Sequence, residues 1–196
     1  MVFPISKYII WPLLRLFIKK IDGLENIPDR SCVIVCNHGS LIDAVIMIFL
    51  IAWHKNKRVR SIAIKTHFTG WFWDMLFKWA GAIRVNGSVQ KAVKAAEKGA
   101  NVLIFPEGGR TYTGEIREPK NTGAGMIALL AKAPVLPIAM NTFYWWSRYQ
   151  KIPSFRRSIK IEIGKPKVFN LKPTRSNAKK VVRTSMKEVK RLRSLI

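Results

Sequence analysis

The chain has 196 residues, enough for one domain with its own core, and its 48% hydrophobic content excludes a disordered chain. The net charge of +24 predicts an anionic partner, such as an anionic lipid surface, an acidic substrate or nucleic acid. Cys32 and Cys36 stand four apart on a predicted strand, about 13 Å from each other, which is too far for a disulfide. The sequence contains no cluster of metal-ligating residues, so we expect no metal.

The first predicted element is an amphipathic helix over residues 3–21. Its apolar and aromatic residues are interrupted by lysines and an arginine, and its longest uncharged run, 8–14, is far shorter than the roughly 20 residues that span a bilayer. Such a helix fits a membrane interface, with Tyr8 and Trp11 at the headgroups, but it also fits a helix packed on the domain. We therefore divide the chain into a membrane-associating segment, residues 1–22, and a globular domain, residues 23–196.

A strand predicted at 33–36 leads into a polar turn that contains His38, Gly39 and Ser40. His38 and Asp43 are five apart, so they point away from each other on a regular helix or strand and can meet only across a strand-to-helix turn. Gly39 permits that bend, and Ser40 is a plausible helix N-cap. Asp43 could then orient the imidazole and leave its other nitrogen free as a base. In the alternative reading, His38 caps the helix and Asp43 is an ordinary acid of its first turn.

The later elements alternate between strands and helices. We expect strands at 33–36, 59–64, 83–85, 102–105, 135–140 and 158–163, and helices at 41–53, 89–98, 122–132 and, as a basic amphipathic helix, 177–196. This alternation predicts an α/β fold with a mostly parallel central sheet flanked by helices. The polar residues His38, Lys65, Asn86 and Glu107 all follow strands, which predicts a site at the carboxyl edge of the sheet.

A second turn, at residues 104–110, has the same design and reads IFPEGGR. The pattern N-H-x4-D followed by F-P-E-G-x-R resembles the glycerolipid acyltransferase family, whose best-known members are the 1-acylglycerol-3-phosphate (lysophosphatidate) acyltransferases. The resemblance covers roughly residues 23–164, so residues 23–196 would be the acyltransferase domain. A fourth family motif, a strand of V-P-V type, is matched at 135–138.

The resemblance implies an enzyme of phospholipid biosynthesis. It would move a fatty acyl group from acyl-CoA or acyl-carrier protein, as co-substrate, to the free hydroxyl of a lysophospholipid. The expected acceptor is 1-acylglycerol-3-phosphate, and the product is phosphatidic acid. No further cofactor is implied. The lipid substrates and the basic charge predict a peripheral or monotopic protein on the anionic surface of the cytoplasmic face of a membrane.

By the same resemblance, His38 is the general base and Asp43 orients it. The candidate substrate-binding residues are Lys65, Arg84, Glu107, Gly108, Arg110 and Lys120. Glu107 and Arg110 match motif residues associated with the phosphate of the acceptor, and Gly109 replaces the usual Thr. A third family motif, G-x-I-x-V-x-R, ends here in Gly87 instead of Arg, which makes Arg84 a substitute candidate and leaves the acceptor headgroup open.

Two other classes of function remain open at this stage. A serine-dependent lipid hydrolase or acyl-enzyme transferase could use Ser40, although the G-x-S-x-G elbow is missing. A basic nucleic-acid-binding domain would explain the charge but neither turn, and no RNP, KH or zinc pattern is present, so we do not expect nucleic acid as a partner. For the acyl chain, the aromatic stretch at 68–79 is the expected groove.

Overall fold

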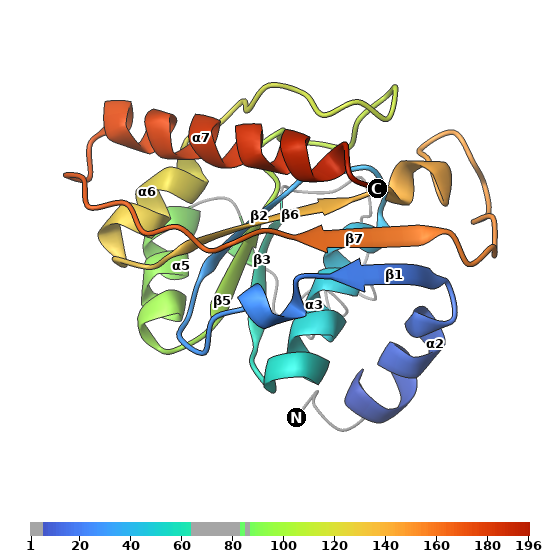
Figure 1. The fold of residues 1–196 in the computed structure, drawn as a ribbon. Coiled ribbons are helices and arrows are strands. Elements are labelled where there is room, and N and C mark those ends of the chain that lie inside the picture. The colour runs from blue at the N-terminus through green and yellow to red at the C-terminus, as the bar shows by residue number, and fades with distance from the viewer. Residues whose placement is uncertain (1–5, 64–82, 85–86) are drawn as a thin grey trace.

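The computed structural model describes residues 6–63, 83–84 and 87–196. Its seven strands form one sheet in the order β1-β7-β6-β2-β5-β3-β4 (Figure 1). The strands are β1 (Ile18–Asp22), β2 (Val33–Cys36), β3 (Val59–Ala63), β4 (Ile83–Arg84), β5 (Asn101–Ile104), β6 (Val135–Met140) and β7 (Ile159–Ile163). Among the pairs of described strands, β6–β7 is antiparallel and the other five are parallel. The predicted α/β fold with a mostly parallel sheet is confirmed.

Helices cover both faces of the sheet. They are α2 (Trp11–Arg15), α3 (Ile42–Lys55), α5 (Ser88–Glu97), α6 (Gly123–Leu130) and α7 (Arg175–Arg193), with a π-helical turn η1 (Ser6–Ile10) and 3-10 turns η2 (Leu24–Asn26) and η3 (Thr142–Tyr144). One buried cluster joins the sheet to α2 and α3, and a second joins it to α5, α6 and α7. In Figure 1, α7 accordingly lies above the sheet while α2 and α3 lie below it.

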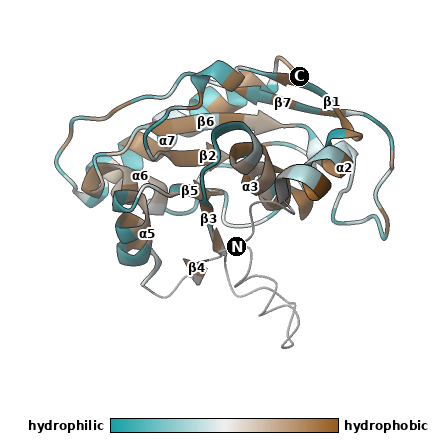
Figure 2. Cartoon of the chain, turned by 90° about the horizontal axis from the view of Figure 1, so that it is seen from below, coloured by the Kyte–Doolittle hydropathy of each residue, from teal (hydrophilic) through white to brown (hydrophobic). Residues whose placement is uncertain are grey.

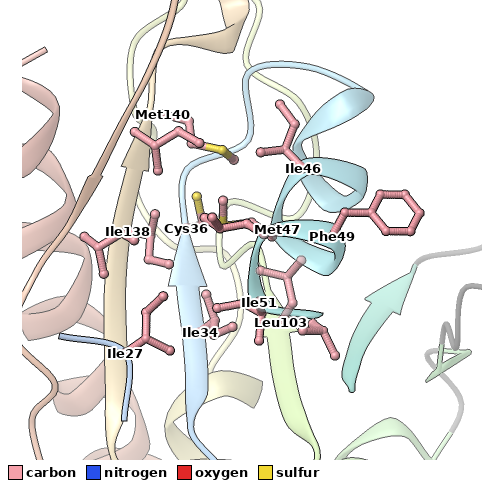
Figure 3. Close-up of a cluster of buried hydrophobic side chains, with 14 of the residues drawn as sticks. Ile27, Ile34, Cys36, Ile46, Met47, Phe49, Ile51, Leu103, Ile138 and Met140 are labelled. Atoms are coloured by element: carbon pink, nitrogen blue, oxygen red, sulfur yellow. The ribbon is translucent and has the colours of Figure 1, made fainter. Parts of the chain in front are cut away.

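The central strands are apolar at every position because both of their faces are covered. All four residues of β2 are buried, and they alternate between the two clusters: Ile34 and Cys36 face α3, whereas Val33 and Val35 face the opposite layer. Figure 2 shows the hydrophobic residues gathered along these strands and α3. Side chains of α3 such as Met47 pack over Cys36 (Figure 3). Both cysteines are free and buried, as core residues.

The two central crossovers run in opposite directions. From β2, the chain passes through α3 to β3, on the far side of β5; from β5, it passes through α6 to β6, on the far side of β2. Because such crossovers are right-handed, reversing their direction moves the helix to the other face of the sheet. The turns that follow β2 and β5 therefore lie at the point where the crossovers reverse direction, the edge at which open α/β sheets bind ligands.

The N-terminal prediction needs a correction. The helix expected over residues 3–21 ends at Arg15, and Ile18–Asp22 forms the edge strand β1, paired in parallel with β7. Ile18 and Ile21 are three apart, which is a helical spacing, but a register irregularity between Ile18 and Lys20 turns both isoleucines toward the core. The strand thus belongs to the domain's sheet, while the membrane role assigned to residues 1–22 stays a prediction.

If β1 is part of the core, Ile18→Ala should lower the free energy of unfolding by about 2–5 kcal/mol, because Ile18 is fully buried and its loss leaves a cavity. Leu16→Ala is the matched control, since Leu16 is 63% exposed and should change stability by less than about 0.5 kcal/mol. Urea unfolding followed by circular dichroism measures both. Equal, small effects would show that the strand is not docked in solution.

Candidate active site

The turn after β2 brings His38 and Asp43 together as predicted. His38 Nδ1 lies 2.9 Å from Asp43 Oδ2. Because a carboxylate oxygen only accepts, Nδ1 carries the hydrogen, and Nε2 presents its lone pair. Nε2 has no partner within the described residues, and the His38 side chain keeps 19% of its exposure while Asp43 has none. The imidazole ring also stacks on Phe105, with ring centroids 4.2 Å apart. The ring is therefore fixed, with one nitrogen facing outward.

Asp43 is held by more than the imidazole. Its Oδ2 accepts a second hydrogen bond from the backbone N–H of Ser40 at 2.8 Å, and its Oδ1 accepts one from the hydroxyl of Thr142 in η3. Ser40 is therefore not the helix N-cap that its position suggested: α3 begins at Ile42, and the acid of the first turn reaches back to the Ser40 N–H. Both oxygens of this buried carboxylate have hydrogen-bond partners, so Asp43 is held in one orientation.

Glu107 joins the two turns. Its side chain is fully buried; Oε1 accepts from the backbone N–H of His38 at 2.7 Å, and Oε2 accepts from the backbone N–H of Arg117 at 3.0 Å. Burial raises the pKa of Glu107, and the hydrogen bonds from Arg117 and His38 partly oppose that rise. The sequence suggested that Glu107 contacts the acceptor. In the structure its oxygens are directed at the chain and away from solvent, so its task is to position the His38 turn.

Further contacts lock the turns against each other. The carbonyl of His38 accepts from the N–H of Thr111 at 2.8 Å. The side-chain amide of Asn37 both donates to and accepts from the backbone of Met140 at the end of β6, each at 2.8 Å. Gly39 allows a close approach, because a Cβ there would lie 2.9 Å from the backbone N of Phe143. Three strand ends thus hold one rigid site.

Cations surround the outer side of this site. Arg110 is partly exposed and forms no ion pair with any described carboxylate. Partial burial and the neighbouring Arg148 lower the pKa of the Arg110 guanidinium from its usual value, and the Asp43 carboxylate partly opposes this effect. Arg148 itself lies over the ring of Tyr112. An unpaired guanidinium close enough to feel the Asp43 carboxylate is suited to a bidentate contact with phosphate.

Gly108 adopts a φ of +72°, which favours glycine, and its N–H donates to the Phe105 carbonyl at 3.1 Å. Lys120 is exposed on the loop formed by residues 111–122 and lies against Gly108. The structure thus gathers His38, Asp43, Glu107, Gly108 and Arg110, with Lys120 at their margin. The side chain of Arg84, all of Lys65 and the stretch 68–79 lie outside the described residues.

Sequence reasoning missed three residues of the site. Asn37 is adjacent to the motif, but the amide's partner is a strand that comes about one hundred residues later in the chain. Thr142 follows β6 in a segment without a motif, and its hydroxyl reaches Asp43. Arg117 lies in the polar loop at 111–122, where it bonds Glu107 and donates to the Gly109 carbonyl. Its position two residues after the end of a third parallel strand was the one signal that could have identified Thr142.

Thr142→Val keeps the shape of the side chain but leaves Asp43 Oδ1 buried without this donor. We expect this change to lower the free energy of unfolding by about 1–3 kcal/mol. Thr142→Ser, which restores the hydroxyl, should recover most of the loss. Urea denaturation of the two variants and the parent measures the difference. Equal stability of the Val and parent proteins would show that the hydroxyl does not bond to Asp43.

Comparisons with known proteins agree with this geometry. The family model described as acyltransferase matches residues 19–141, which include both turns. A 1-acyl-sn-glycerol-3-phosphate acyltransferase of Pseudomonas aeruginosa is 30% identical over 154 residues, 74% of this chain and 57% of that protein. The chloroplastic 1-acyl-sn-glycerol-3-phosphate acyltransferase BAT2 of Brassica napus is 32% identical over 126 residues, 61% of this chain and 36% of that protein.

The chain thus spans only 57% and 36% of the lengths of these two curated relatives. Among solved structures, the 1-acyl-sn-glycerophosphate (LPA) acyltransferase PlsC of Thermotoga maritima is similar to the whole fold. It has a TM-score of 0.64 at 25% identity, with 90% of this chain and 71% of that chain covered. With the family model spanning more than half of its residues and the His38 and Glu107 turns in place, the chain belongs to the acyltransferase family.

Proposed function

We propose that this protein transfers a fatty acyl group from a thioester to the free hydroxyl of a lysophospholipid. The acceptor is 1-acylglycerol-3-phosphate, and the product is phosphatidic acid. The observation that carries the proposal is the imidazole of His38, held by Asp43 through Nδ1 with Nε2 open. The unpaired guanidinium of Arg110, which feels the Asp43 carboxylate, adds to it. The relatives named as 1-acyl-sn-glycerol-3-phosphate acyltransferases support the acceptor. The donor is acyl-CoA or acyl-carrier protein.

The reaction proceeds in one displacement. His38 Nε2 takes the proton from the acceptor hydroxyl while that oxygen attacks the carbonyl carbon of the thioester. The tetrahedral intermediate collapses with loss of the thiolate, which takes the proton back from the imidazolium. Asp43 stabilises that imidazolium throughout. The oxyanion of that intermediate needs a backbone N–H donor from one of the two turns. The N–H of Gly108 is donated to the Phe105 carbonyl, so we assign this role to Gly39, whose N–H has no partner within the described residues.

Arg110 binds the phosphate of the acceptor in this scheme. Arg110 has no ion-pair partner among the described residues, and a bound phosphate would supply one. The phosphate oxygens also match the planar fork of the guanidinium. Arg148 adds a second positive charge close by. Lys65 and Arg84 stay candidates for further contacts with the substrates, and the stretch 68–79 stays the candidate for the acyl-chain groove.

The rival functions fit the site less well. Ser40 is fully buried, and its hydroxyl accepts from the Ile42 N–H at 3.4 Å, so it is not presented to a substrate as a nucleophile would be. A nucleic-acid-binding domain would need no buried pair such as His38 and Asp43. The geometry therefore favours direct transfer to the acceptor over an acyl-serine intermediate.

For localisation, we propose peripheral attachment to the anionic cytoplasmic face of a membrane. Within the described residues, no helix is long and apolar enough to cross a bilayer. Two neighbouring segments nevertheless expose apolar side chains: the η1–α2 segment exposes Ile9, Leu13 and Leu16, and the loop after η3 exposes Ile152 and Phe155. The rings of Phe17 and Phe155 lie 6.1 Å apart and connect the two segments. Together they offer an apolar surface for insertion into the interface.

His38→Ala should abolish acyl transfer, and Asp43→Asn should slow it by roughly 10²–10⁴-fold, because the base is lost or misoriented. The assay measures thiol release from a palmitoyl thioester with lysophosphatidate as acceptor. His54→Ala is the matched control, a histidine at the far end of α3 that should retain full activity. Circular dichroism verifies that each variant is folded.

The same assay separates the rival classes. Ser40→Ala should keep its turnover under direct transfer, whereas an acyl-serine mechanism requires it to be inactive. A folded His38→Ala protein with normal turnover would refute the mechanism proposed above. Thiol release that is independent of lysophosphatidate would indicate a hydrolase.

The membrane surface is tested by replacing Leu13 and Leu16 together with Asp. Binding to vesicles that contain anionic phosphatidylglycerol should fall by at least about tenfold, because two inserted leucines become two repelled charges. Val168→Asp is the control, an exposed apolar residue that lies outside both segments. Flotation of vesicles at low and high salt measures the binding. Unchanged flotation of the double variant would assign the attachment to another surface.

A further inference from the structure

The molecule presents different chemistry on the two faces of its sheet. On one face, the helix α2 exposes Leu13, and the residue that follows the helix, Leu16, is exposed as well. The helix α7, on the other face, buries its apolar side against the sheet and contains eight Lys and Arg residues against one acid, Glu188. Figure 1 shows α7 above the sheet and α2 below it. A lipid-facing surface on the α2 side therefore leaves the basic side of α7 directed toward solvent.

A groove runs between α7 and the end of the 111–122 loop. Its volume is about 350 Å³. Four of its lining residues are cations that come from two separate elements: Lys120, Arg175, Lys179 and Arg183. The one acid that lines it, Glu118, is already paired with Lys190 at 2.7 Å. Within the described part of the chain, none of the four cations forms an ion pair. The groove is thus a concave, positively charged surface with side-chain amide and hydroxyl groups from Asn121 and Thr122.

The groove adjoins the catalytic turn. Lys120 is fixed at one end of it by its backbone N–H, which donates to the Pro106 carbonyl at 2.9 Å. A Cβ at Gly108 would lie 3.6 Å from Lys120 Cβ, so the two residues are in contact. Gly108 follows Glu107, whose carboxylate accepts from His38. A ligand whose charged end occupies the groove can therefore reach His38 with its other end.

The four cations suit a small polyanion. Like charges held together from two elements repel each other, and an anion with several negative oxygens relieves that repulsion. The acceptor's phosphate lies close to its own reacting hydroxyl, and Arg110 is available for it beside His38. The donor differs, because in acyl-CoA a long flexible arm separates the thioester from a phosphorylated nucleotide. A phosphate site set apart from the base therefore fits the donor.

We infer that this groove binds the 3′-phosphorylated adenosine diphosphate end of acyl-CoA, an inference that rests on the function proposed above. Lys120, Lys179 and Arg183 contact its phosphates. The pantetheine arm then runs past Gly108 and presents the thioester to His38. The donor enters from the α7 side, and the lipid acceptor enters from the α2 side.

The test uses Lys179→Gln combined with Arg183→Gln in the full chain. The matched control is Lys180→Gln combined with Lys187→Gln, which removes the same two charges from α7 outside this groove. Binding of adenosine 3′,5′-bisphosphate is measured by calorimetry. We expect its Kd and the KM for palmitoyl-CoA to rise about fivefold to tenfold in the groove variant and to stay near the parent values in the control. The KM values for lysophosphatidate and for S-palmitoyl-pantetheine should be unchanged.

Three other outcomes overturn the inference. If the affinity for adenosine 3′,5′-bisphosphate falls equally in the groove and control variants, the nucleotide is attracted by the general positive charge of α7 and not by this groove. A raised KM for lysophosphatidate would assign the groove to the acceptor headgroup, and a raised KM for palmitoyl-carrier protein with none for palmitoyl-CoA would assign it to an acidic protein. A failure of the proposed function is distinguishable from these outcomes. If the groove variant loses nucleotide binding but the parent protein transfers no acyl group, the nucleotide site is supported and the proposed reaction is refuted.

Discussion

The site depends on two buried carboxylates, Asp43 and Glu107, that follow neighbouring parallel strands. A carboxylate without partners is very costly to bury, so each has been supplied with hydrogen-bond donors from turns distant in sequence. Glu107 binds the backbone of His38 and of Arg117, and Asp43 binds His38, Ser40 and Thr142. The acids need these donors, and the donors are held in place by the acids. That mutual requirement fixes the imidazole more firmly than the short turn alone could.

Glu107 also shows that this arrangement has an energetic cost. Burial raises its pKa above the value of the unfolded chain. Because the pKa is raised on folding, the stability that depends on this group is fully present below the unfolded pKa and falls as the pH rises through the folded pKa. A glutamine would avoid that cost, but its NH₂ group could not accept from the second N–H. The presence of a glutamate at position 107 is therefore explained by the two backbone N–H groups that donate to its two oxygens.

The central strands, their alternation with helices and the two turns could be predicted because each carries a local signal. An apolar run such as 33–36 followed by a glycine-containing polar turn defines a buried parallel strand and its carboxyl end. The hydrogen-bond partners of Thr142 and Arg117 could not be found from such local signals, because those partners are set by the packing of strands that lie far apart in the sequence. The strand β1 was missed for another reason: the irregularity between Ile18 and Lys20 gives a strand the spacing of a helix.

The topology also fits the transfer proposed above, in which one base serves two substrates of opposite character. The crossover helices after β2 and β5 cover opposite faces of the sheet, and the turns that carry His38 and Glu107 meet at the edge between those faces. In the proposed transfer, a lipid that approaches from the α2 side and a phosphorylated donor that approaches from the α7 side would reach the same edge without displacing each other. Direct transfer requires both to be bound at once, and a base placed on either face alone would meet only one of them. His38 stands at the point where the two approaches converge.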